Sequence, residues 1–241
     1  MLEAAFWGFV GGGALLVGAV VGVYLPVSSR MIGLVMAFGS GVLVSALSFE
    51  LTREAYDKAG GTSVILGLLA GSLVFFIGDW FIDRRWGHRR KNPHGTQPGA
   101  GAMALVLGAL LDGIPESAAI GVSLIGGGGV GIAVVAAVFL SNVPESLAAS
   151  TGMKASGRTT SYILGLWLAV TAASTVAAAL GYGFLSGADP VVVATIQAFA
   201  AGAILTMLAD TMLPEAVEHA GPFVGVLTAV GFVAAFLLSV A

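Results

Sequence analysis

Eight stretches of about 20 predominantly apolar residues follow one another along the chain, and they constrain its fold more than any other feature. A helix of that length crosses the hydrocarbon core of a bilayer. Only 10% of the 241 residues are charged, against about 25% in a typical soluble domain. The stretches cover residues 4–26, 31–51, 63–82, 102–124, 130–152, 161–185, 190–212 and 222–240. We expect an all-α membrane protein with eight transmembrane helices, a single domain over residues 1–241 in the cell membrane.

The basic residues predict how this bundle is oriented. The longest break, residues 83–101, is rich in arginine, proline and glycine, so we expect a cytoplasmic loop there. If the N-terminus lies outside, eight of the ten Lys and Arg residues fall on the inner side, and only Arg53 and Lys58 fall outside. Cytoplasmic loops are enriched in Lys and Arg. Both termini are therefore expected to be extracellular or periplasmic.

An internal repeat links the second and seventh stretches. Residues 37–43 resemble residues 198–204, and Glu54-Ala55 resembles Glu215-Ala216, all at an offset of 161 residues. Because the two stretches would cross in opposite directions, the pattern predicts an inverted repeat, a frequent plan for transporters. Spans one to three and six to eight would then form pseudo-symmetric halves around spans four and five.

A polar motif occurs twice, in the middle of the fourth and fifth stretches. Residues 112–117 read D-G-I-P-E-S, and residues 141–146 read S-N-V-P-E-S. Asp112, Glu116 and Glu145 would lie near the bilayer midplane, where each carboxylate costs about 2.5–3.5 kcal/mol. No Lys, Arg or His in the core of either stretch can neutralise them. We therefore expect a cation, protons or both at this site.

The spacing of these residues favours a shared site. Asp112 and Glu116 are four apart, and Asn142 and Glu145 are three apart, so each pair lies on one helix face. The short turn between the stretches makes the two helices antiparallel neighbours. The proline in each motif frees a backbone carbonyl four residues earlier, which adds a further oxygen ligand or water anchor.

The paired proline-glutamate motifs resemble those of the ZIP (Zrt/Irt-like) metal transporter family, whose fourth helix carries H-N-x-P-E-G. The chain is similar to a divergent, prokaryotic-type member. Residues 199–203, F-A-A-G-A, and residues 213–216, L-P-E-A, also match elements of the seventh helix in that family. The resemblance covers nearly the whole chain and implies a ZIP-like bundle that transports divalent metal ions.

The motif departs from the family at the ligands. Asp112 stands at the motif histidine, and Gly113 stands at the asparagine. The resemblance therefore implies one metal ion, bound by the side chains of Asp112, Glu116, Asn142 and Glu145. The family favours zinc, whereas an all-oxygen ligand set favours manganese, ferrous iron or broad divalent transport.

Five further polar residues are expected to be accessory ligands or to line the ion path, with solvated helix ends as the alternative for several. They are Ser141, Asp210, Glu215, Glu218 and His219.

We expect a passive or weakly coupled carrier that moves metal toward the cytoplasm, with the metal as substrate and no cofactor. A non-transporting metal sensor or assembly subunit is the alternative. An intramembrane hydrolase would need a motif such as H-E-x-x-H, and no histidine lies in a span core. No enzymatic activity and no nucleic-acid partner are expected, and a homodimer is left open.

Overall fold

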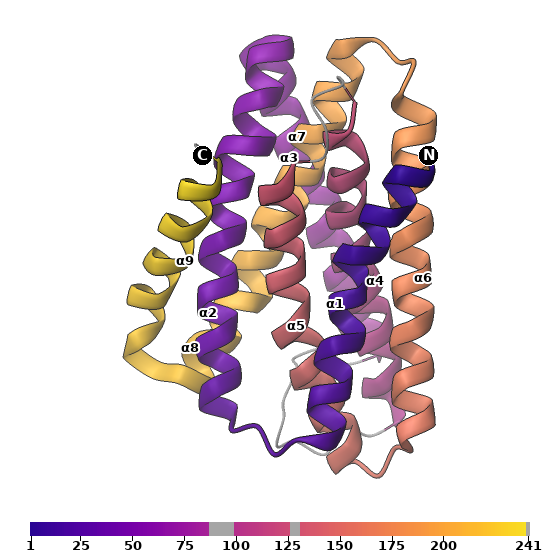
Figure 1. The fold of residues 1–241 in the computed structure, drawn as a ribbon, viewed down its shortest axis with the longest axis vertical. Coiled ribbons are helices and arrows are strands. Elements are labelled where there is room, and N and C mark those ends of the chain that lie inside the picture. Colours follow the sequence, from indigo (N-terminus) through magenta and orange to yellow (C-terminus); the bar gives the residue numbers. More distant parts are fainter. Residues whose placement is uncertain (87–98, 126–130, 240–241) are drawn as a thin grey trace.

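The computed structural model describes residues 1–86, 99–125 and 131–239, without the side chains of residues 86 and 99–106. Every regular element in these residues is a helix, and the helices lie side by side in one bundle (Figure 1). In chain order they are α1 Leu2–Tyr24, α2 Ser29–Ala46, the π-helical segment η1 Leu47–Thr52, α3 Arg53–Trp86, α4 Gly99–Ser123, α5 Ile132–Ala155, α6 Thr160–Leu185, α7 Pro190–Met207, the π-helical segment η2 Leu208–Met212, α8 Leu213–Ala220, the 3₁₀ segment η3 Gly221–Phe223 and α9 Val224–Ser239.

Helices extend into both ends of the region predicted as a loop, residues 83–101. α3 ends only at Trp86, and α4 already begins at Gly99. The charged residues at the end of α3 are still part of the helix, because long basic side chains can lie against apolar surface. Arg84, for example, stacks 4.2 Å above the Trp80 ring. The rest of the predicted loop lies outside the described residues.

The described residues include five stretches that are long and apolar enough to cross a membrane, so the chain is a multi-pass α-helical membrane protein. They are Leu2–Tyr24, Ser29–Arg85, Ile132–Ala155, Thr160–Leu185 and Pro190–Ser239. Two of them contain 57 and 50 residues, more than twice the length that one crossing needs. Each of these two holds a glycine with positive φ, 73° at Gly60 and 67° at Gly221, where one helix ends and the next begins. Glycine adopts this conformation without a steric penalty because it has no Cβ.

Backbone features recur at the 161-residue offset of the predicted repeat. The π-helical segments begin at Leu47 and Leu208, and the positive-φ glycines are Gly60 and Gly221. Helix contacts recur as well. A Cβ built on Gly41 of α2 would lie 1.9 Å from a backbone oxygen of α9, and one built on Gly202 of α7 would lie 2.1 Å from a backbone oxygen of α3. The two segments thus share local conformation as well as sequence.

The two copies of this repeat run in opposite directions. Gly33 of α2 packs against His219 of α8, whereas Gly39, farther along α2, packs against Met212 of η2. As residue numbers rise along α2, the numbers of its neighbours fall, so α2 is antiparallel to the η2–α8 segment. An inverted repeat requires such an antiparallel arrangement of its two copies.

A second group of helices, α1, α4, α5 and α6, holds the duplicated motif. Small residues let these helices approach closely, as expected where backbones pack in a membrane protein. Gly12 of α1 accepts a hydrogen bond from Thr171 of α6 at 2.9 Å, and Gly121 of α4 packs on the Ala178 backbone of α6. α5 lies against both α1 and α2, so its motif faces the interior of the whole bundle (Figure 1).

Candidate metal centre

Both copies of the motif lie inside helices, and their polar side chains are buried. Pro115 lies within α4 and Pro144 within α5, each one residue before its glutamate. The exposed fraction is 1% for Asp112, 0% for Glu116 and 6% for Glu145. Acidic residues are almost never so deeply buried unless a partner or an ion compensates the lost hydration.

A small cavity lies where α4 and α5 meet α2 and the η2–α8 segment. The cavity has a volume of about 10 Å³, which is room for a single water molecule or bare ion. Acidic side chains from three helices line it, without any basic side chain. The lining residues are Met36, Asp112, Glu145, Met207, Thr211, Met212 and Glu215. Their carboxylate and hydroxyl oxygens, together with methionine sulfurs, form a set that suits a cation and repels an anion.

Glu116 joins the two motif helices. Its Oε1 accepts a hydrogen bond of 3.2 Å from the Ser141 hydroxyl, which also donates to the Val138 carbonyl at 3.0 Å. Glu116 comes from α4 and Ser141 from α5, so this contact fixes the two copies of the motif against each other. Neither residue lines the small cavity.

Asn142 is turned toward another helix. Its Nδ2 donates a 3.2 Å hydrogen bond to the Gly11 carbonyl of α1, and the side chain does not line the cavity. Of the four residues predicted as ligands, Asp112 and Glu145 therefore share the cavity. Glu116 and Asn142 are buried beside it and bonded to other groups.

The five accessory residues separate into different surroundings. Glu215 is 4% exposed and lines the cavity, and Ser141 holds Glu116. Asp210 is exposed and lines a different cavity, of about 490 Å³, with Asp79 and Asp83 of α3.

Glu218 and His219 do not line the central cavity either, although they lie on the same short helix as Glu215. Glu218 is exposed and His219 is partly exposed. These two residues and Asp210 are not brought together with the duplicated motif.

The cavity also contains residues that were not predicted as site residues, namely Met36, Met207, Thr211 and Met212. Methionine is a usual filler of apolar cores, so its presence in an apolar stretch carries no signal. Thr211 could have been found from the repeat, because it lies 161 residues after the acidic Glu50.

Within the described ranges, no three His, Cys, Asp or Glu side chains converge closely enough to enclose a metal ion. The acids around the cavity would need new rotamers, or their helices a small shift, before they could all touch one ion. The conformation is thus one in which carboxylates surround a narrow space without closing on its centre.

The chain is similar to a protein of Arabidopsis thaliana whose name describes it as a candidate zinc transporter. The two are 26% identical over 208 residues, which cover 85% of this chain and 33% of the plant protein. The chain thus spans about a third of the length of the curated relative that it matches. No family model matches the chain.

Proposed function

We propose that the chain carries divalent metal cations across the cell membrane toward the cytoplasm, as a ZIP-like transporter. The observation that supports this most strongly is the cavity between α4, α5 and α8. Three buried acids, Asp112, Glu145 and Glu215, line a space of single-ion size, and no basic residue lines it. Intramembrane carboxylates around a cavity mark ion pathways. The likeness to a plant protein named for zinc transport supports the same reading.

The proposed topology has eight spans with both termini outside. Splitting the two over-long helical stretches at Gly60 and Gly221, and counting α4 as a span, gives eight crossings. Both termini then lie on the side opposite the Arg30, Lys154 and Arg158 positions, in agreement with the enrichment of basic residues in cytoplasmic loops. The pseudo-symmetric halves would rock around α4 and α5 and expose the cavity to each side in turn.

The transported ion is proposed to bind Asp112 and Glu145 first, because both already line the cavity. Glu116 completes the set by turning from the Ser141 hydroxyl to the ion, and Asn142 completes it through Oδ1, the amide atom that does not donate to the Gly11 carbonyl. Every side-chain donor in this set is an oxygen. Two helices that are already packed together supply all four side chains, so one ion is enough to link them.

The ligand chemistry admits zinc, manganese and ferrous iron. Carboxylate and amide oxygens suit manganese, whereas thioether sulfur, present here in Met36, Met207 and Met212, suits softer ions such as zinc. We therefore propose transport of several divalent metals, with zinc among them.

Uptake by proteoliposomes tests the proposal. Vesicles that contain the purified chain should take up radioactive zinc or manganese in a saturable manner, and protein-free vesicles should not. Competition by other divalent ions at equal concentration ranks the substrates. A chain that binds metal but moves none across the vesicle membrane would instead be a sensor or an assembly subunit.

A further inference from the structure

A second polar cluster, around one buried amide, lies at the start of α3, where α7 passes beside it. Gln197 of α7 is 1% exposed. Its Nε2 donates to Glu54 Oε2 at 2.7 Å and to the Glu50 carbonyl at 3.2 Å. The other polar atom of this amide, Oε1, is buried and has no hydrogen-bond partner. The amide oxygen and nitrogen can be exchanged by a flip, but either orientation leaves one buried polar atom without a partner.

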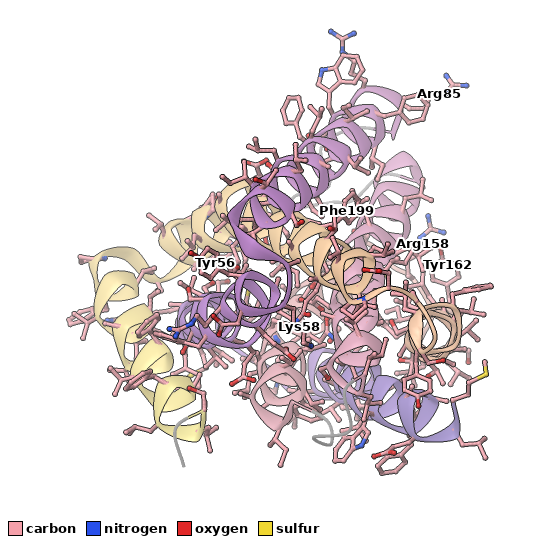
Figure 2. All side chains as sticks on the ribbon, turned by 90° about the horizontal axis from the view of Figure 1, so that it is seen from above. Tyr56, Lys58, Arg85, Arg158, Tyr162 and Phe199 are labelled. Atoms are coloured by element: carbon pink, nitrogen blue, oxygen red, sulfur yellow. The ribbon has the colours of Figure 1, made fainter. Side chains whose placement is uncertain are left out.

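Carboxylates and one lysine complete this cluster. Lys58 donates to Glu54 Oε1 at 2.5 Å, so the two oxygens of Glu54 bridge an ammonium and a buried amide. The Lys58 side chain is only 30% exposed and, seen from above, lies over the middle of the bundle, whereas Arg85 lies at its rim (Figure 2). Glu50 lies one turn before Glu54, in the π-helical segment η1 that leads into α3. A positive group thus already pairs with the carboxylate that accepts a hydrogen bond from the Gln197 amide.

The internal repeat relates this cluster to the wall of the central cavity. An offset of 161 residues takes Met36 to Gln197, Glu50 to Thr211 and Glu54 to Glu215. Met36, Thr211 and Glu215 together line the central cavity. Each of these three cavity residues therefore has a counterpart in the other copy of the repeat. The counterparts, in the cluster at the start of α3, carry an amide and two carboxylates.

We propose that Gln197, Glu50 and Glu54 form a second binding site for a divalent cation, in which Lys58 is a tethered counter-ion that the incoming ion displaces. Amide and carboxylate oxygens are ligands for hard divalent cations such as Mn²⁺. The orphaned Gln197 oxygen would gain a partner, and Glu54 would exchange one cation for another. Binding by this cluster does not depend on transport. We infer a second role for this site, as the first place where an entering ion binds, and that role rests on the proposed function.

Counting bound Mn²⁺ on the purified chain, by equilibrium dialysis or by loss of the free-ion electron paramagnetic resonance signal, tests this site. The double variant Glu116→Gln/Glu145→Gln disables the central site, so the ion it retains reports on the second one. We expect this chain to bind one Mn²⁺. Adding Glu54→Gln or Gln197→Met should weaken that binding at least tenfold. Adding Asp57→Asn, an exposed acid one turn away that pairs with Arg53, should leave it unchanged.

A gain-of-affinity variant guards against misfolding. Lys58→Gln removes the competing ammonium and should tighten Mn²⁺ binding several-fold, which a damaged fold cannot imitate. The proposal is overturned if the Glu116→Gln/Glu145→Gln variant binds no Mn²⁺. It is also overturned if adding Glu54→Gln or Gln197→Met to that variant leaves its Mn²⁺ affinity unchanged. Retained Mn²⁺ in a protein that transports nothing would refute the proposed function and leave this site standing.

Discussion

Two glutamates on one short helix differ in what surrounds them. Glu215 is buried and lines the central cavity, whereas Glu218, three residues later in α8, is exposed. Both residues are glutamates of the same helix, so a difference between their variants reports on the cavity rather than on the local helix.

Glu215→Gln should lower the initial rate of metal uptake at least tenfold, because it removes one of three carboxylates that compensate the charge of the ion in a buried space. Glu218→Gln should retain the rate of the unmodified chain. Uptake into proteoliposomes with equal amounts of each variant measures both. Equal rates for the two variants would show that Glu215 takes no part.

At the residue level, the sequence singled out two acids that line the cavity but not the residues beside them. Asp112 and Glu145 stand out because a carboxylate in an apolar stretch needs a physical reason. Met36 and Met212 do not, since a methionine in such a stretch is ordinary. The bond from Asn142 to Gly11 could not be foreseen, because it joins residues 131 apart whose contact depends on tertiary packing.

Contact between helices α3 and α7 depends on glycines at their crossing. A Cβ on Gly71 would lie 1.9 Å from the Phe199 backbone oxygen, far inside contact distance. Gly165 of α6, in contrast, has no atom beyond its own helical backbone within 4 Å of the place where its Cβ would stand.

Gly71→Ala should therefore destabilise the chain by about 1–3 kcal/mol, as overpacking of a well-packed core does. Gly165→Ala should be neutral or should stabilise by up to about 1 kcal/mol, since alanine is the better helix former. The midpoint of thermal unfolding in one detergent measures both. An unchanged midpoint for Gly71→Ala would contradict the close approach of the two helices.

At the level of elements, the length of the apolar stretches predicted where helices occur. The charged residues that follow a stretch led to a wrong prediction of where its helix ends. Asp83, Arg84 and Arg85 suggested a loop, but α3 continues through them because their side chains extend past the apolar surface. The π-helical segments were not predicted, since one extra residue in a helical turn leaves no mark on composition. Their positions agree with the repeat that the sequence did reveal.

The orientation of the whole bundle can be tested with single cysteines, because the chain has none of its own. Ser186 and Ala155 are both exposed, and they lie at the ends of α6 and α5. In the proposed topology Ser186 faces the outside and Ala155 faces the cytoplasm.

A membrane-impermeant maleimide added to intact cells should label Ser186→Cys and leave Ala155→Cys unlabelled until the membrane is permeabilised. The reverse pattern would invert the topology, and with it the direction of the proposed entry path. The cysteine-free parent serves as the control for background labelling in both conditions.

The central claim is that metal crosses the membrane by way of the cavity at the duplicated motif. The most direct measurement is the initial rate of zinc and manganese uptake by proteoliposomes that carry Glu145→Gln, compared with the unmodified chain and with Glu3→Gln, an exposed acid in the first turn of α1. We predict that Glu145→Gln falls to the rate of protein-free vesicles while Glu3→Gln matches the unmodified chain. Undiminished uptake by a correctly folded Glu145→Gln chain would contradict the claim.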